Sequence, residues 1–129
     1  MFEANAAAAI KTVEALRQAY SAGQRDFSGI SLPAAPLNDC DLQGADLSYA
    51  DLSEADLSGA HLRGTDLSYA NLQGATLSQT DLRGAMLIGT DLRHTTLTTA
   101  DLHGADYDPT ETHFPQGFDP IQAGMRRDR

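Results

Sequence analysis

The sequence contains no tryptophan and few aromatic residues of any kind. Aromatic side chains make up 6% of the 129 residues, which argues against a conventional globular core built on large rings. No apolar stretch approaches the ~20 residues that a helix needs to cross a bilayer. Leucine and alanine must therefore provide most of the buried surface, and we expect no association with a membrane.

Cysteine is nearly absent as well. The single cysteine, Cys40, excludes an internal disulfide, which fits a reducing compartment. Residues 1–24 lack a basic start followed by an apolar run, so no signal peptide is expected. Together these absences predict a cytoplasmic protein.

Positive charge is scarce. Eighteen acidic residues stand against nine Lys and Arg, and the net charge is −9. Phosphates attract cations, so direct binding of nucleic acid is not expected. The negative charge fits either a basic partner or the simpler task of keeping the chain soluble.

What the sequence does have is a leucine that returns every five residues from Leu32 to Leu102, with Phe27 and Tyr107 extending the series at its two ends. On a helix, five residues rotate the side chain by about 140°, so these residues would spiral around the surface. On a strand, five residues turn the side chain to the opposite face. A chain that buries every fifth residue must turn a corner between leucines, which indicates a solenoid.

The residues around each leucine support this interpretation. From Leu42 onward, small residues stand two positions before each leucine, mostly Ala or Thr and once Cys40, as expected where an inner side chain meets a corner. One position before it, aspartate recurs and should point outward. Serine, glutamine, arginine or threonine follows the leucine, and glycine often comes next.

The pattern Ala-Asp-Leu-Ser-Xaa resembles the pentapeptide-repeat family, and seventeen pentads in register from Phe27 to Tyr107 carry the resemblance. The flanking segments 20–27 and 114–125 are similar to those of short, stand-alone cyanobacterial members. The resemblance implies an all-β solenoid, a right-handed quadrilateral β-helix with four pentads per coil. About four coils at strand spacing give a rod ~20 Å long. The expected core includes Phe27, Leu42, Leu62, Leu82 and Leu102.

Three segments are expected along the chain. Residues 3–24 are predicted to hold a capping helix, because an alanine run is followed by apolar residues three or four apart and Gly23 stands at a C-terminal cap position. Residues 25–109 form the repeat. Residues 110–129 are predicted to be an irregular C-terminal cap that contains Phe114 and Phe118, with its end at 126–129 disordered.

With four pentads per coil, residues twenty apart share one column. Asp26, Asp46, Asp66 and Asp106 then form a column that Met86 interrupts. A second column holds Arg63 and Arg83 beside acidic residues, and the corner next to it is glycine in every coil (Gly44, Gly64, Gly84 and Gly104), which predicts type II turns. Tyr49 and Tyr69 should stack on another corner. The candidate interaction surface comprises Tyr49, Tyr69, Asp46, Asp66, Arg63 and Arg83, although the tyrosines could merely shield the corner and the charges could merely be a solvated wall.

No motif points to catalysis, to a cofactor or to a metal. The four histidines have no cysteine or histidine partner at metal-binding spacing, and Cys40 fits a packed thiol better than a nucleophile. The aspartates form rows because the unit repeats, so their pairing does not indicate acid–base chemistry. A leucine-filled tube also leaves no interior pocket. We therefore expect neither an enzyme nor a bound cofactor.

The leading interpretation is a non-catalytic rigid scaffold that presents a surface to an unknown protein partner. The alternative, from another class, is an acidic mimic of DNA that binds a DNA-binding protein such as gyrase, as some members of the family do. The family resemblance also allows a regulatory binder in cyanobacterial differentiation or stress, which no residue selects. We expect a monomer rather than an end-to-end dimer, provided that the tail covers Phe114 and Phe118.

Overall fold

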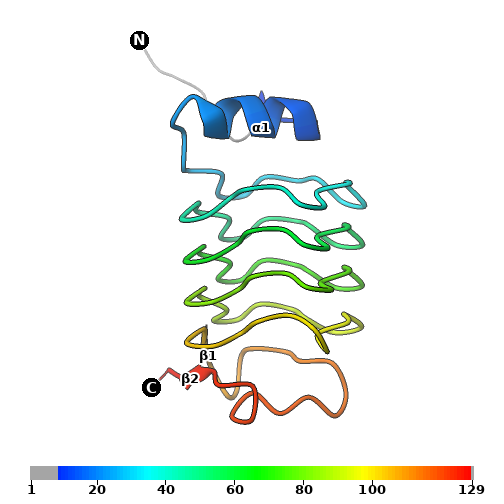
Figure 1. Cartoon of the computed structure of the whole chain (residues 1–129), viewed down its shortest axis with the longest axis vertical. Helices are drawn as coiled ribbons and strands as arrows, with labels where there is room; N and C mark the ends of the chain where they lie inside the picture. The colour runs from blue at the N-terminus through cyan, green and yellow to red at the C-terminus, as the bar shows by residue number, and fades with distance from the viewer. Residues whose placement is uncertain (1–8, 129) are drawn as a thin grey trace.

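A computed structural model describes residues 9–128, and within them the chain winds into a square solenoid between a helix and an irregular tail (Figure 1). The named elements are α1, Val13–Ser21, and two short parallel strands, β1, Asp106–Tyr107, and β2, Arg126–Arg127. Each remaining side of the solenoid contributes isolated bridges rather than long strands. No helix in the described part of the chain is long and apolar enough to cross a membrane.

Parallel bridges join residues twenty apart, so each coil contains four pentads. We number the sides by their central residues. Face 1 carries the bridges Asp26–Asp46–Asp66–Met86–Asp106, face 2 carries Ser31–Asp51–Asn71–Asp91, face 3 carries Pro36–Asp56–Thr76–Thr96, and face 4 carries Asp41–His61–Asp81–Asp101. These are the four columns that the sequence predicts, and the quadrilateral solenoid is confirmed.

The central residues fill the interior. Phe27, Leu42, Leu62 and Leu82 are 0% exposed and Leu102 is 2% exposed. The small residues two positions earlier pack beside them, and buried threonines at these positions bond to backbone carbonyls, as Thr80 Oγ1 does to Leu57 O at 2.7 Å. Within residues 9–128 every buried side-chain nitrogen or oxygen has a hydrogen-bond partner. The buried polar side chains of the core are therefore satisfied by hydrogen bonds, which favours a rigid rod.

The corners are turns with one residue at positive φ, except at Thr99. At the glycine corner between faces 4 and 1, Gly44 has φ 72° and Ala45 N donates to Leu42 O at 3.0 Å, the geometry of a type II turn. The predicted turns are confirmed, but the same geometry also occurs at non-glycine corners. Seven residues adopt it: Ala34, Asp39, Tyr49, Glu54, Tyr69, Gln79 and His94.

Within the described residues the helix is shorter than predicted. α1 begins at Val13, because Thr12 is extended (φ −140°, ψ 158°) and its side chain accepts a hydrogen bond from Ala15 N. Residues 3–8 of the predicted helix lie outside the described residues. The helix ends at Ser21 rather than at 24, and Gly23 (φ 101°) closes a Schellman motif in which Gln24 N donates to Ala19 O.

α1 lies across the first end of the solenoid (Figure 1). Leu16 is 0% exposed and joins the cluster of buried core residues, and Ile10, just before the helix, is 7% exposed in the same cluster. The Tyr20 hydroxyl donates to Gln43 O at 2.7 Å. The predicted apolar stripe therefore faces the coils.

The tail continues the winding. Leu92 N donates to His113 O at 2.6 Å, and buried Thr112 donates its hydroxyl to Leu87 O at 2.7 Å. These are the contacts of a further pentad centred on Phe114, displaced by two extra residues after Tyr107. The sequence analysis missed this unit because the insertion breaks the five-residue spacing.

The expected disorder at 126–129 is wrong for 126–128, and residue 129 lies outside the described residues. β2 pairs in parallel with β1: Arg126 N donates to Ala105 O and Asp128 N to Tyr107 O, both at 2.7 Å. Twenty residues separate β1 from β2, so the end of the tail returns to face 1 in the register of one more coil. The tail gains backbone partners that composition alone does not reveal.

Candidate functional site

Tyr49 and Tyr69 form an aromatic edge where face 1 meets face 2. Their rings stack with centroids 5.4 Å apart and planes 15° apart, so the predicted stack is confirmed. Tyr49 is 67% exposed and Tyr69 is 44% exposed. Both sit at positive φ on a corner of the coil, which directs them away from the core. Exposed aromatic rings of this kind are enriched at protein interfaces.

The Tyr69 side chain is held on both sides. Its ring lies above Gly89, one coil further on, where an added Cβ would approach the ring to 2.3 Å. Its hydroxyl donates to Glu111 Oε1 at 3.0 Å, and this hydrogen bond raises the pKa of Tyr69. The edge therefore runs from the second coil to the inserted residues of the tail as a preorganised surface.

Met86 and Ile88 add to this surface, and the sequence analysis did not select either. They take the two outward positions of face 1 in the fourth coil, where the second and third coils have Asp and Ser. Met86 is 42% exposed, Ile88 is half-buried, and Tyr69 N donates to Ile88 O at 2.9 Å. The signal that would have found them is the departure from Asp-Leu-Ser. We call Tyr49, Tyr69, Met86 and Ile88 the apolar patch.

Asp46 and Asp66 lie on face 1 before the patch and are half-buried. Asp46 Oδ1 accepts from Ser48 N at 3.0 Å and from Ser48 Oγ at 2.6 Å, and Asp66 Oδ1 accepts from Ser68 N at 2.9 Å. Each aspartate thus orders its own corner in an Asx arrangement. Oδ1 of each aspartate therefore has a structural role in its corner, while the negative charge of the carboxylate remains at the surface.

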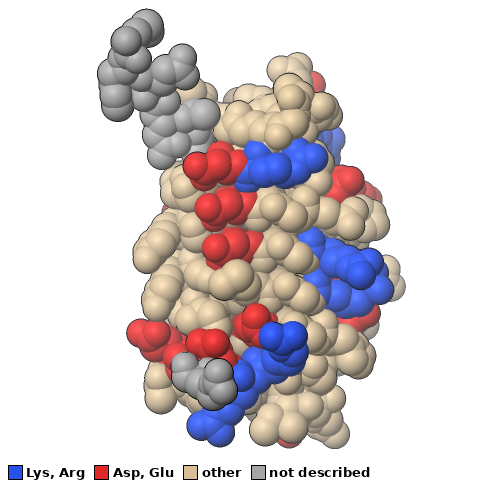
Figure 2. Space-filling view, turned by 90° about the vertical axis from the view of Figure 1, so that its left-hand side faces the viewer, with Lys and Arg blue, Asp and Glu red and all other residues tan. Residues whose placement is uncertain are grey.

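The two arginines belong to another group of side chains. Arg63 and Arg83 follow the central residues of face 4, around the glycine corner from Asp66. Figure 2 shows acidic side chains in a vertical row in the upper half of the view and a basic group to the right of it. The structure therefore brings together Tyr49, Tyr69, Asp46 and Asp66, and places the arginines on the adjoining face.

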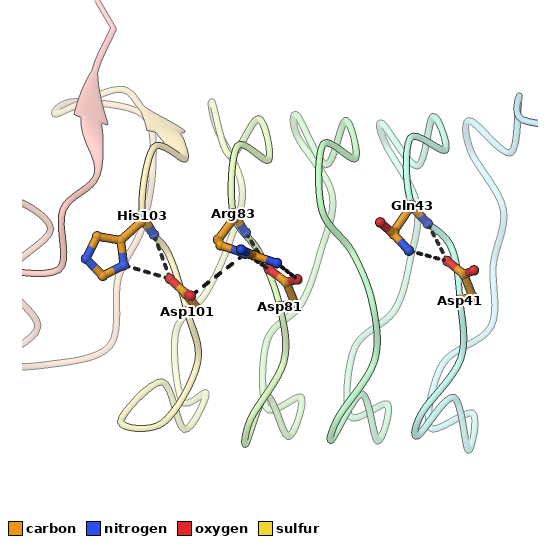
Figure 3. A network of polar contacts seen from close by, with 6 residues as sticks. All are labelled: Asp41, Gln43, Asp81, Arg83, Asp101 and His103. Carbon is orange, nitrogen blue, oxygen red and sulfur yellow. Dashed lines mark hydrogen bonds and ion pairs between the residues drawn. The ribbon is translucent and has the colours of Figure 1, made fainter.

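Face 4 carries a polar ladder (Figure 3). Arg83 binds Asp81 through two hydrogen bonds, Nε to Oδ1 at 2.9 Å and Nη2 to Oδ2 at 2.8 Å, and its Nε lies 3.9 Å from Asp101 Oδ2. His103 Nδ1 contacts Asp101 Oδ1 at 2.7 Å. These hydrogen bonds lower the pKa of Asp81 and of Asp101. The carboxylates are kept ionised and occupied, which suits a stable wall better than acid–base catalysis.

Hollows lie at both ends of the solenoid. One of about 680 Å³ lies where α1 meets the first coils, beside Arg17, Tyr20 and Cys40. Burial raises the pKa of the Cys40 thiol, so the nucleophilic thiolate is suppressed. Another, of about 460 Å³, lies between the fourth coil and the tail, beside His103 and Phe118. Among residues 9–128 no three His, Cys, Asp or Glu side chains are grouped so as to hold a metal ion.

Comparison with known families gives one match. A family model described as pentapeptide repeats matches eight copies, over residues 26–64, 40–79 and 65–104. A comparison with the curated proteins finds no match.

Solved structures provide further similarity. The crystal structure of alr5209, a pentapeptide repeat protein from Nostoc PCC 7120, is 50% identical with a TM-score of 0.90, over 92% of this chain and 98% of that one. Rfr23 from the cyanobacterium Cyanothece 51142 is 34% identical over 69% of this chain and 63% of its own, with a TM-score of 0.48. HetL from Nostoc PCC 7120 is 32% identical over 82% of this chain and 57% of its own, with a TM-score of 0.40.

Proposed function

The chain belongs to the pentapeptide-repeat family, and from this premise we propose that it is a non-catalytic, rigid scaffold that presents a surface to a protein partner. The family's right-handed quadrilateral β-helix accounts for the four faces. One observation carries the proposal: the apolar patch stands on an otherwise polar wall, with Tyr49 67% exposed and Met86 42% exposed. A surface that only has to stay soluble gains nothing from exposing these side chains.

Rigidity supports the same proposal. The core consists mainly of central leucines, rings and small residues, and backbone hydrogen bonds link each coil to the next. A partner that binds one face therefore meets side chains whose positions are set before binding, which lowers the entropic cost of association. We propose that α1 and the tail serve as caps, because a solenoid coil needs a neighbour on both sides to be stable.

Affinity capture tests the scaffold proposal. The wild-type chain and the variant Tyr49→Gly/Tyr69→Gly are immobilised, and proteins retained from a lysate of the source organism are compared. Glycine suits these corners, since Gly29 and Gly89 occupy the same edge. Gln79→Gly is the matched control, because Gln79 has the same positive φ on a different edge. The proposal expects a partner that the wild type and Gln79→Gly retain and the tyrosine variant loses; capture of nothing specific by any of them contradicts it.

A second candidate is mimicry of DNA, and the row Asp26–Asp46–Asp66 favours it. The three carboxylates lie one coil apart on face 1, at ~4.8 Å. This spacing is longer than the rise of about 3.4 Å per step between phosphates along one DNA strand. Met86 interrupts the row, and Arg126 lies 3.1 Å from Asp106 at its far end. A gyrase supercoiling assay, with and without a quinolone, tests this candidate, and no effect at micromolar protein excludes it.

The proposal includes a monomer in the cytoplasm. Support for the monomer comes from the tail, where Phe114 stacks on Phe118 at 5.1 Å and meets Tyr107 edge-on at 5.7 Å, both against the core. Rings that are already paired in this way offer less surface for an end-to-end dimer. Light scattering during size exclusion tests the monomer, and cell fractionation tests the compartment.

A further inference from the structure

Met86 and Ile88 interrupt the regular wall of face 1 at one coil only. On face 1 the outward positions are Asp and Ser in the first three coils, and Met86 and Ile88 replace them in the fourth. Asp and Ser would order the corner through an Asx arrangement, as Asp46 and Ser48 do. The fourth coil gives up these hydrogen bonds and exposes a thioether and an aliphatic side chain. A purely structural repeat has no reason to make this exchange on an exposed face.

The exposed apolar groups are continuous with the tyrosine edge. Ile88 precedes Gly89, and the Tyr69 ring lies directly above Gly89, with Tyr49 stacked on Tyr69. The patch therefore extends along the rod for about three coils rather than around it. An elongated apolar strip of this shape fits an extended segment lying parallel to the solenoid axis.

The rim of the patch is acidic. Asp46 and Asp66 precede Met86 in the column and Asp106 follows it, while Glu111 accepts the hydrogen bond of Tyr69. Among residues 9–128 neither Asp46 nor Asp66 has an ion pair with Lys or Arg, and Arg126 lies 3.1 Å from Asp106. The carboxylates before the patch are free to meet cations of another molecule. Phosphate backbones and anionic lipids would be repelled here.

We propose that this surface binds a basic, extended protein segment in which an apolar side chain stands between lysines or arginines. The proposal rests on the scaffold function above and names the class of partner. Asp66 and Asp106 lie two coils apart, about 10 Å, with Met86 between them. Alternate residues of an extended segment are about 6.7 Å apart on one side, so a cation two residues before the apolar residue reaches Asp66. A second cation two residues after the apolar residue bends its long side chain inward to Oδ2 of Asp106, because Oδ1 already faces Arg126.

The experiment is an NMR titration of the isotope-labelled full chain with three synthetic peptides. The first, Ser-Lys-Ser-Leu-Ser-Lys-Ser, carries the proposed chemistry. The second replaces Leu by Ser, and the third replaces both Lys by Glu. The expected result is that only the first peptide shifts amides of 46–49, 66–69 and 86–89, and that added salt weakens its binding.

Three variants identify the groups responsible. Met86→Asp/Ile88→Ser restores the repeat of the neighbouring coils, so it should fold, and is expected to weaken binding about tenfold by removing the apolar contact. Asp46→Asn/Asp66→Asn removes two charges and is expected to weaken binding about threefold to tenfold. It keeps the Asx acceptor, as Asn71 Oδ1 shows by accepting from Gln73 N at 3.0 Å. Asp56→Asn on face 3 is the matched control and should change nothing.

Three results of the peptide titration would overturn the inference: equal binding of the glutamate peptide, shifts on another face, or no shift by any peptide at millimolar concentration. Each leaves the scaffold proposal standing, because that proposal requires a protein partner but not a basic, extended one. Conversely, a partner captured equally well by wild type and by Met86→Asp/Ile88→Ser overturns this inference alone. Concentration-dependent shifts of the free chain over the patch would assign it to a second copy and also overturn the inference.

Discussion

The ring of Tyr69 occupies the space above Gly89, one coil further along the same edge, where an added Cβ would come within 2.3 Å of the ring. Asp39 lies above Gly59 in the same way, and Glu54 above Gly74. Large corner side chains lean onto the following coil, and glycine at that corner leaves them room. Glycine therefore has two separate roles in this chain, backbone freedom at a corner and accommodation of the side chain above it.

These two roles can be separated by comparing Gly44→Ala with Gly89→Ala. Both residues have positive φ (72° and 70°), but nothing lies within 4 Å of a Cβ added at Gly44. Gly44→Ala should lower the free energy of unfolding by about 1 kcal/mol, the net of left-handed strain and reduced freedom of the unfolded chain. Gly89→Ala should lower it further, because Tyr69 must also move. Urea unfolding measures both, and equal losses would contradict the second role.

The stacked leucines predict that the stability lost on replacing a leucine by alanine depends strongly on its position along the rod. Leu62 is 0% exposed in the middle of the stack, whereas Leu32 is 6% exposed in the first coil. Leu62→Ala should cost about 2–5 kcal/mol, because the cavity is enclosed by coils on both sides and cannot collapse. Leu32→Ala should cost less, since the end of a solenoid relaxes more easily. Chemical denaturation compares the two, and a larger loss at Leu32 would argue against a stack stabilised by its neighbours.

The repeat could be predicted because the same five-residue pattern recurs many times along the chain. Seventeen central residues in one spacing leave a single way to bury them, and the bridges between residues twenty apart confirm the columns. The pattern of the tail occurs only once, so no repetition in the sequence reveals its geometry. Two extra residues before Thr112 shift the last pentad out of register, so only the hydrogen bonds of Thr112 and His113 reveal it.

The ends of α1 and the candidate surface were harder to predict for different reasons. The alanine run favours a helix from residue 3, but residues 3–8 lie outside the described residues, and the capping geometry of Thr12 begins α1 at Val13. At the surface, Tyr49 and Tyr69 were predicted from their column. The sequence analysis treats Met86 only as an interruption of the acidic column. Its place in an apolar patch depends on Ile88 and on the Tyr69 ring of the previous coil. The arginines were grouped with the tyrosines, but Arg63 and Arg83 lie around a corner on face 4.

Acid should destabilise the rod, and the sign of the effect follows from two aspartates that pair with arginine, Asp81 and Asp91. Hydrogen bonds from Arg83 lower the pKa of Asp81, and hydrogen bonds from Arg93 lower the pKa of Asp91. The unfolded chain binds protons at these carboxylates more readily than the folded chain does. The stabilisation that the two ionised carboxylates give the folded state is therefore complete above the ordinary Asp pKa of 3.8. It is lost as the pH falls through the lowered values. Urea midpoints between pH 6 and pH 2 measure the effect.

Asp81→Asn/Asp91→Asn should flatten this pH dependence. Asparagine keeps the acceptor for the backbone amide two residues on, as at Asn71, while the ion pair and its titration disappear. The variant should be less stable than wild type at pH 6 by a small amount, because surface ion pairs contribute ~0–1 kcal/mol each. A variant whose urea midpoint falls as steeply as that of wild type between pH 4 and pH 2 would show that other carboxylates control acid unfolding.

Thr112 tests whether the tail is a true continuation of the solenoid. Its hydroxyl donates to Leu87 O at 2.7 Å and accepts from Asp108 N at 3.0 Å. Thr112→Val keeps the shape and removes both hydrogen bonds, which should lower the free energy of unfolding by about 1–3 kcal/mol. Thr98→Val, at an exposed position of the fourth coil, is the control and should cost much less.

Hydrogen exchange then distinguishes a shared transition from local fraying. If the tail belongs to the last coil, Thr112→Val should speed exchange of the Arg126 and Asp128 amides, which donate to Ala105 O and Tyr107 O. The Leu92 amide, bonded to His113 O, should accelerate with them, because one cooperative unit opens as a whole. Faster exchange confined to residues 108–113, with Arg126 and Asp128 unchanged, would mean that β2 holds to face 1 independently of the inserted pentad.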